Sequence, residues 1–124
     1  MTEPKVIIVE DDPYFGPDLK KFLEVEANVS LFSNPDALAQ AAQESSINFR
    51  EADLIVLDYR FDSYSAWNKD IITYSKELGY KGKILLWSLE DDISEQFLEQ
   101  VDGVMPKRLF SLAEAKQCLE AYAR

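Results

Sequence analysis

The sequence predicts an α/β fold in which a strand and a helix alternate five times, a doubly wound (βα)5 sandwich built on a five-stranded parallel sheet. Two observations support this prediction. Short apolar runs recur along the 124 residues, and stretches with helical apolar spacing lie between them. Three of the runs are continuously apolar instead of alternating, which is typical of strands that helices cover on both faces. Such alternation implies parallel strands joined by right-handed crossovers.

The predicted strands come first in each of the strand–helix units. Their apolar runs span residues 6–9, 29–32, 54–57, 84–87 and, more weakly, 104–105. Three of the runs are apolar throughout: VIIV, LIVL and ILLW, the first, third and fourth. Their only polar side-chain atom is the indole nitrogen of the tryptophan. We therefore expect these three strands to be buried on both faces of the sheet.

The helices are predicted by apolar side chains that recur every three or four residues. The sets with this spacing are Phe15, Leu19, Phe22 and Leu23; a segment from Pro35 through about Ser45; Trp67, Ile71, Tyr74 and Leu78; Ile93, Phe97 and Val101; and Leu112, Ala115, Leu119 and Tyr122. Asn34 is the expected N-cap of the second helix, and Gly79 closes the third. Pro17 leaves two alternatives for the first helix, a kink at the proline or a regular helix that starts there.

Length and composition indicate one globular domain that spans residues 1–124. Apolar residues make up 47% of the chain, yet no apolar run reaches the roughly 20 residues that a membrane helix needs. The N-terminal residues MTEPK lack the layout of a signal peptide. We therefore expect a cytoplasmic protein that does not bind a membrane.

The residues that are absent exclude several kinds of chemistry. The chain has no histidine and a single cysteine, Cys118, which excludes histidine-based catalysis, histidine metal sites and an internal disulfide. The net charge is −10, with 23 acidic against 13 basic residues. Because phosphate contacts supply most nucleic-acid affinity, direct nucleic-acid binding is not expected. The charge favours protein partners or cations.

Acidic residues follow two of the predicted strands at the points where these strands end. Glu10, Asp11 and Asp12 follow the first strand, and Asp58 follows the third. Taken alone, each acid is as readily explained by a solvated loop or by a helix N-terminus, which favours negative charge. In open parallel sheets, however, ligands bind outside the carboxyl ends of the strands. If the first and third strands are neighbours, Glu10, Asp11 and Asp58 meet at one edge.

Two further polar side chains come at the ends of the fourth and fifth strands. Ser88 ends the run ILLWS, and Lys107 comes just past the fifth strand. Ser88 has a second interpretation as the cap of the fourth helix, and Lys107 as an ordinary surface lysine. Clustered carboxylates repel one another unless a cation lies among them, and Mg2+ prefers such oxygen ligands. A metal, an ammonium and a hydroxyl together neutralise phosphoryl oxygens, and a carboxylate can accept a phosphoryl group.

With these motifs in this order, the sequence resembles the receiver domain of two-component response regulators, of the chemotaxis-regulator type. The resemblance spans roughly residues 5–122 and rests on VIIVEDD, LIVLD, ILLWS and GVMPK in the family's order and spacing. Each motif alone is common, whereas all four in register are specific. The resemblance implies a flavodoxin-like fold with strand order 2-1-3-4-5 and a stand-alone receiver.

The resemblance assigns the acidic residues their roles. Asp58 would be the phosphoacceptor. The metal, Mg2+, would be held by Glu10, Asp11, Asp58 and the backbone carbonyl of Arg60, with Asp11 touching it directly and Glu10 through water. Asp12 falls one position past the acidic pair and is expected to start the first helix.

The resemblance also assigns the contacts to the phosphoryl group and the switch region, with three departures from the family pattern. Ser88 and Lys107 would contact the phosphoryl group, and Ser88, Leu89 and Val104 would form the switch region. Arg108 stands where a proline usually follows the lysine; since a cis bond there costs about 2.5–4 kcal/mol, we expect the Lys107–Arg108 bond to be trans, or else a strained cis bond. Val104 replaces an aromatic residue and Leu89 a small one. A signal through Ser88 would therefore use movement of the backbone or of a helix.

The resemblance implies phosphorelay signalling. A histidine kinase or histidine phosphotransfer protein would phosphorylate Asp58, and output would pass to a downstream protein through the face formed by the fourth helix, fifth strand and fifth helix. The chain would assist its own phosphorylation and dephosphorylation without being a conventional enzyme, and a homodimer is compatible with this function.

Three alternatives stay open. The first is a pseudo-receiver, a scaffold or adaptor with the same fold that is never phosphorylated. The second is a Mg2+-dependent phosphatase, which would want a second carboxylate where Arg60 stands. The third is that the chain is part of a longer regulator.

Overall fold

The computed structural model describes residues 3–58, 65–88, 95–106 and 112–123. Within them, strands and helices alternate along the chain as the sequence predicts. In chain order the elements are β1 (Lys5–Val9), α1 (Phe15–Leu23), β2 (Asn28–Phe32), α2 (Pro35–Gln43), β3 (Leu54–Asp58), α3 (Ser65–Glu77), β4 (Lys83–Ser88), α4 (Glu95–Leu98), β5 (Gly103–Pro106) and α5 (Leu112–Tyr122). Each strand matches its predicted apolar run to within one residue at either end.

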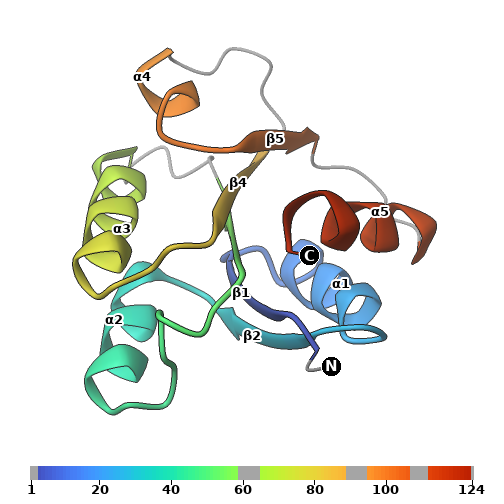
Figure 1. Cartoon of the computed structure of the whole chain (residues 1–124), viewed down its shortest axis with the longest axis horizontal. Coiled ribbons are helices and arrows are strands. Elements are labelled where there is room, and N and C mark those ends of the chain that lie inside the picture. The colour runs from blue at the N-terminus through green and yellow to red at the C-terminus, as the bar shows by residue number, and fades with distance from the viewer. Residues whose placement is uncertain (1–2, 59–64, 89–94, 107–111, 124) are drawn as a thin grey trace.

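The described strands form one parallel sheet in the order β2-β1-β3-β4-β5. The predicted doubly wound (βα)5 fold and its strand order are therefore confirmed. In Figure 1, helices α1 and α5 lie on one face of the sheet and helices α2 and α3 on the other. Because β1 and β3 are direct neighbours, the condition for the convergence of the predicted acids is met.

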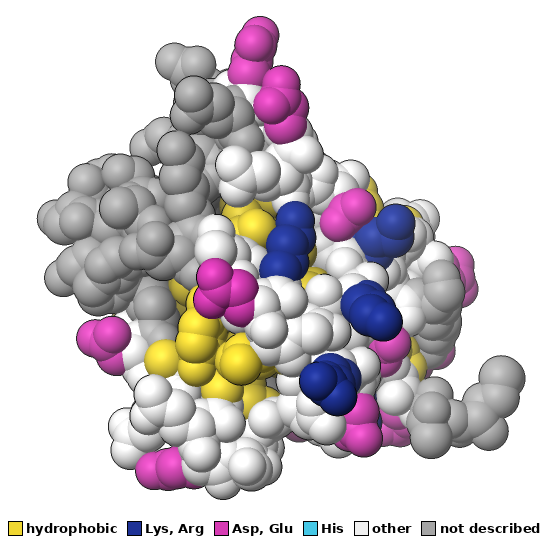
Figure 2. Space-filling view, turned by 60° about the vertical axis from the view of Figure 1, so that its left-hand side comes forward, with side chains coloured by type: hydrophobic (Ala, Val, Ile, Leu, Met, Phe, Trp, Pro, Cys, Tyr) yellow, Lys and Arg dark blue, Asp and Glu magenta, His cyan; other side chains and the backbone are white. Residues whose placement is uncertain are grey.

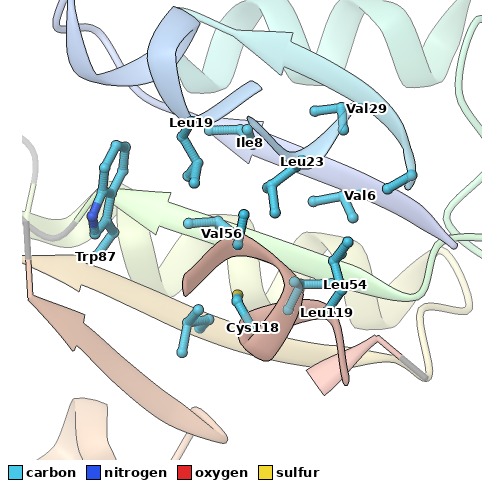
Figure 3. Packing of buried hydrophobic residues seen from close by; sticks show 13 residues of the cluster. Val6, Ile8, Leu19, Leu23, Val29, Leu54, Val56, Trp87, Cys118 and Leu119 are labelled. Atoms are coloured by element: carbon cyan, nitrogen blue, oxygen red, sulfur yellow. The ribbon is translucent and has the colours of Figure 1, made fainter. Parts of the chain in front are cut away.

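Alternating side chains of the strands build two separate cores. Ile8 and Val56 belong to the cluster that packs against α1 and α5, shown in Figure 3. Val9 and Leu57, the next residues along β1 and β3, belong to the cluster on the α2 and α3 face. Strands β1, β3 and β4 each contribute fully buried residues to both clusters. This confirms the double-sided burial that their continuous apolar runs predict.

The predicted boundary signals of two helices are confirmed. The side chain of Asn34 accepts a 2.8 Å hydrogen bond from the N–H of Ala37, as an N-cap does. Gly79, just past α3, has a φ of 94°, a left-handed conformation that glycine adopts at little cost.

Helix α1 starts before its proline. It runs without interruption from Phe15, and Pro17 lies in its first turn. A proline is tolerated there, because the N–H groups of a first turn have no acceptor within the helix. The N–H of Asp18 donates to the carbonyl of Tyr14 at 3.1 Å, so the helical hydrogen bonds already begin ahead of Pro17. The helix thus starts two residues earlier than a start at the proline would give.

Other helix ends differ from the predicted apolar stripes. A single turn of α4, Glu95–Leu98, lies within the described residues, and Val101 packs against the core from beyond it. Ile93 lies outside the described residues. Leu78 and Leu112, the end members of two stripes, are each 40% exposed. Their helical spacing is right, but Leu78 follows the end of α3 and Leu112 begins α5, and the terminal turn of a helix can extend past the strands that the helix covers.

Helix α2 ends two residues earlier than expected, because Ser45 adopts a left-handed conformation with a φ of 61°. The N–H of Ser45 donates to the carbonyl of Ala42 at 3.2 Å, and the N–H of Ser46 donates to that of Ala41 at 2.9 Å. These two bonds are the Schellman pattern, in which the left-handed residue is usually glycine. A Cβ atom at this position is therefore a local strain.

Carboxylates at the amino edge of the sheet are paired with backbone N–H groups and lysines. Asp53 accepts a 2.8 Å hydrogen bond from the N–H of Lys5, and Asp102 accepts one of 2.8 Å from the N–H of Ile84. The ammonium of Lys83 lies 3.7 Å from the carboxylate of Asp102. These acids join the starts of neighbouring strands, so their role is structural.

The surface on the side of α2 and α3 carries charges of both signs. Figure 2 shows basic side chains interspersed with acidic ones on this side, with apolar side chains reaching the surface between them. Among the described residues on this face, the mixed signs leave no continuous basic patch that a polyanion could bind. None of the helices in the described part of the chain has the length and apolar composition needed to cross a membrane.

We expect Ser45→Gly to stabilise the protein by about 0.5–1 kcal/mol, because glycine removes the Cβ strain of the left-handed conformation. Urea unfolding followed by circular dichroism measures the change. Ser46→Gly is the matched control: it alters the adjacent exposed serine, which does not have a positive φ, and should bring no gain. Equal gains in both variants would contradict the assignment.

Burial predicts a pH dependence of stability in the alkaline range. Cys118 is 7% exposed in the core beneath α1 and α5, and this burial raises the pKa of its thiol from about 9 to about 11. Between these values the unfolded chain releases a proton that the folded chain keeps. The free energy of unfolding should therefore fall by about 1 kcal/mol as pH rises from about 8 to about 10. Cys118→Ala should show a shallower decline in urea titrations across this range, and identical slopes would refute the effect.

Candidate functional site

The carboxyl ends of β1 and β3 bring Glu10 and Asp58 side by side. Val9 is paired with Leu57 in the parallel register, so the residues that follow them are adjacent at the edge of the sheet. The N–H of Glu10 donates to the carbonyl of Phe32 at 2.9 Å, which extends the β1–β2 ladder one residue beyond β1. The backbone position of Glu10 is thus held by the sheet.

Three of the predicted site residues come together at this edge. Glu10, Asp11 and Asp58 each offer a carboxylate oxygen, and these oxygens all lie within 4.8 Å of one another. Glu10 and Asp58 are each only 2% exposed, whereas Asp11 is exposed. The cluster therefore has a buried part and one carboxylate toward solvent. Ligation of Mg2+ and phosphorylation of Asp58 stay predictions.

The spacing of the cluster fits a hard divalent cation. Two unit charges about 5 Å apart repel by roughly 3 kcal/mol at an effective dielectric constant of about 20. A cation among the oxygens replaces this repulsion by attraction. Oxygens around a six-coordinate Mg2+ at about 2.1 Å lie roughly 3–4 Å apart, only slightly closer than the 4.8 Å limit for the three acids. The donor set and its spacing therefore fit the ion that the sequence predicts.

Asp12 is separate from this cluster and starts the first helix, as predicted. Its side chain accepts hydrogen bonds from the N–H groups of Tyr14 at 2.8 Å and Phe15 at 3.0 Å. Its own N–H donates to a carboxylate oxygen of Glu10 at 3.1 Å. The three consecutive acids thus have different environments, because the side chain of Asp12 accepts hydrogen bonds from N–H groups at the start of α1, whereas Glu10 and Asp11 belong to the acidic cluster.

Gly16 lets helix α1 approach the acidic cluster. A Cβ atom at this position would lie 3.3 Å from Cγ of Glu10 and 3.2 Å from a methyl group of Leu31. Both distances are tighter than ordinary van der Waals contact, so a side chain would push α1 away from the end of β1. Sequence reasoning missed this residue. The available signal was a glycine in the first turn of a predicted helix, where it has a cost that packing must offset.

Ser88 and Val104 are described, and both lie at the predicted positions in the sheet. Ser88 is the last residue of β4 and is 4% exposed. Its alternative role as the cap of the fourth helix stays open, because residues 89–94 lie outside the described residues. Val104 lies in β5, paired with Leu86, and is 40% exposed. Their roles in phosphoryl contact and in switching stay predictions.

The remaining predicted site residues lie outside the described residues. These are Arg60 with its backbone carbonyl, Leu89, and Lys107 with the bond that joins it to Arg108. The described half of the site is therefore the acidic cluster and Ser88.

Sequence reasoning also missed the place of Trp87. This residue is paired with Asp58 in the β3–β4 register, and its ring meets that of Phe15 edge to face, with ring centroids 5.7 Å apart. The alternation along ILLWS could have indicated that Trp87 and Ser88 point to opposite faces. It could not indicate which residue of β3 lies opposite the indole.

No protein-family model matches the chain, and no curated protein does. Solved structures do match. The chain is similar to a CheY-like response regulator receiver domain from Methylobacillus flagellatus, with 17% identity, 97% of this chain and 98% of that chain covered, and a TM-score of 0.76. A response regulator from Thermotoga maritima matches with 16% identity, 97% coverage of both chains and a TM-score of 0.72. A receiver domain protein from Clostridium thermocellum has 15% identity, 95% and 92% coverage and a TM-score of 0.73. The fold is therefore that of response regulator receiver domains.

We expect Asp58→Asn to raise the free energy of unfolding in metal-free buffer by about 1–3 kcal/mol, because it removes one of three mutually repelling charges. Added Mg2+ should stabilise the wild-type protein more than this variant. Urea unfolding with and without a chelator measures both effects.

Glu51→Gln is the control for a mere change in net charge. It removes the same unit of charge from an exposed carboxylate that lies 2.7 Å from the ammonium of Lys5, so no stabilisation is expected. If Asp58→Asn gains no more stability than Glu51→Gln, the acids do not repel as described.

Proposed function

We propose that the chain is a phosphoacceptor receiver of a two-component phosphorelay, in which Asp58 is phosphorylated in the presence of Mg2+. The convergence of Glu10, Asp11 and Asp58 at the carboxyl edge of the sheet is the observation that carries this proposal. The likeness of the fold to receiver domains supports it. In this role the chain transmits a signal and is not a conventional enzyme.

The metal would be held by the side chains of Glu10, Asp11 and Asp58 and by the backbone carbonyl of Arg60. Mg2+, when bound, supplies positive charge that offsets both the carboxylates and the oxygens of an incoming phosphoryl group. Asp11 is the exposed member of the cluster and lies where an ion enters from solvent. Glu10 and Asp58 are buried and give the site its fixed part.

Asp58 would act as the nucleophile. Its carboxylate oxygen attacks the phosphorus of a phosphohistidine, the phosphorus–nitrogen bond breaks, and the imidazole leaves as an acyl phosphate forms on Asp58. The histidine must belong to a partner, a histidine kinase or histidine phosphotransfer protein, because this chain has none. The hydroxyl of Ser88 and the ammonium of Lys107 would hold the phosphoryl oxygens, since such transfer depends mainly on positioning and charge neutralisation.

Output would pass through the face made by α4, β5 and α5. This face exposes three large apolar side chains: Leu98 is 44% exposed, and Val104 and Leu112 are each 40% exposed. Exposed apolar side chains on neighbouring elements favour binding to another protein, a downstream target or a second copy of this chain. Movement of Ser88 and Leu89 on phosphorylation would bias this face toward one of two arrangements.

A pseudo-receiver is the second candidate. Val104 favours it, because the family usually has an aromatic switch residue there and this chain has an exposed valine. In that case the same face would bind its partner without phosphorylation.

We expect a mass gain of one phosphoryl group when the protein is incubated with Mg2+ and acetyl phosphate, because the small donor reaches Asp58 without a partner. Intact-protein mass spectrometry measures it. Asp58→Asn should abolish the gain, and omission of Mg2+ should suppress it. Absence of the modification with acetyl phosphate and with phosphorylated histidine partners would favour the pseudo-receiver.

Two adjacent acids provide a matched pair for the metal site. Asp11→Asn should reduce phosphorylation and weaken Mg2+ binding by about 10-fold or more, because it removes a ligand. Asp12→Asn changes a neighbouring carboxylate whose role is to start α1, and asparagine serves equally well there. Similar losses in both variants would contradict the assignment of the two residues.

A further inference from the structure

The acidic cluster has an aromatic residue directly behind its acceptor. Asp58 and Trp87 are partners in the parallel register of β3 and β4, and their exposed fractions are 2% and 1%. Val56 and Leu85, two residues earlier on each strand, belong to the core beneath α1 and α5, as Trp87 does. Because every second residue of a strand points to the same face, the side chain of Asp58 leaves β3 on the face where the indole of Trp87 lies.

Figure 3 shows this end of the core. Trp87 lies where β3 ends, and Leu54, the first residue of β3, lies at the opposite end of the cluster. Among the residues labelled in Figure 3, the indole thus lies nearest to the carboxyl end of β3, where Asp58 is located. The cluster of acids has an apolar neighbour on the core side and solvent on the side of Asp11.

Contacts with α1 hold the indole in place. Its ring meets Phe15, the first residue of α1, at an interplanar angle of 89°. Gly16, the next residue, lies against the stem of Glu10, where a Cβ atom would be 3.3 Å from Cγ. The start of α1 therefore contacts both the indole of Trp87 and one of the two buried acids, Glu10.

We propose that Trp87 is a positioning residue for the acceptor: its indole, held by Phe15, is the dry wall that fixes the Asp58 carboxylate and thereby sets the affinity of the acidic cluster for Mg2+. This inference rests on the proposed function. The apolar shell around a metal site controls access of water and the local dielectric constant. Without the wall, water on the core side would lessen the repulsion among the empty carboxylates and let Asp58 turn away from its neighbours. Both effects would make the free energy of Mg2+ binding less favourable.

The test is calorimetric titration of the whole chain with MgCl2, at a temperature at which circular dichroism shows each variant folded. Trp87→Leu should raise the Kd for Mg2+ by about 10-fold, as loss of a supporting residue does at metal sites. Trp87→Phe keeps an aromatic wall that can still meet Phe15 edge to face, and should stay within about threefold of the wild type.

Leu85→Ala is the control for loss of packing. Leu85 is as buried as Trp87 and lies on the same face of the same strand, but it is paired with Val56 and not with an acid. This variant should lose stability and keep the wild-type Kd. If Trp87→Leu binds Mg2+ like the wild type, or if Leu85→Ala weakens binding as much, the inference is overturned while the proposed function stands. If the wild-type chain does not bind Mg2+, both are overturned.

A second measurement needs no change at position 87. In the variant Trp67→Phe the indole of Trp87 is the only one in the chain. Its fluorescence should change on addition of Mg2+ with a midpoint equal to the calorimetric Kd, and Asp58→Asn should abolish the change. Emission that does not respond at a saturating concentration would show that the indole does not adjoin the occupied cluster, and would overturn the inference even if Trp87→Leu fails to fold.

Discussion

The parallel pairing of β1 with β3 is the constraint on which the candidate site depends. Residues 48 positions apart, Glu10 and Asp58, become neighbours only because Val9 is paired with Leu57. A slip of one residue in this register would turn every side chain of β3 to the opposite face and separate the two acids. Since both faces of these strands are apolar, it is the close packing of particular side chains in the two cores that opposes such a slip. The packing that stabilises the sheet therefore also positions the acids.

The carboxylates at the two edges of the sheet have different environments. At the amino edge, Asp53 and Asp102 accept hydrogen bonds from backbone N–H groups at the starts of neighbouring strands, and these acids stabilise the fold. At the carboxyl edge, Glu10 and Asp58 are buried beside each other and beside Asp11. Their mutual repulsion, taken by itself, opposes folding. A cation bound among the carboxylates would replace this repulsion by attraction.

Helix α1 links the acidic cluster to the core. Its start is held by the side chain of Asp12, its first turn lies against Glu10 at Gly16, and its first residue packs on Trp87. On the side of the core, a shift of the Asp58 carboxylate would thus meet packed side chains. A cluster built in this way is packed on its core side, and its exposed member, Asp11, marks the side toward solvent. The exposed apolar residues of α4, β5 and α5 lie on elements other than α1.

The sequence by itself determined the alternation of strands and helices, the ends of the strands, the N-cap Asn34 and the presence of acids after β1 and β3, because each is encoded by local periodicity or by one residue's conformational preference. A resemblance in four motifs added the strand order, which the tertiary structure bears out. Only the tertiary structure decided that three carboxylates lie within 4.8 Å, that two of them are buried, and that Trp87 stands opposite Asp58. Periodicity tells which face of a strand is apolar, whereas the neighbour of that strand and the register between them result from the packing of the whole chain. The close approach at Gly16 was beyond local patterns for the same reason, because it depends on Leu31 of another strand. The left-handed Ser45 was missed because glycine, and not serine, usually has this conformation at a helix end.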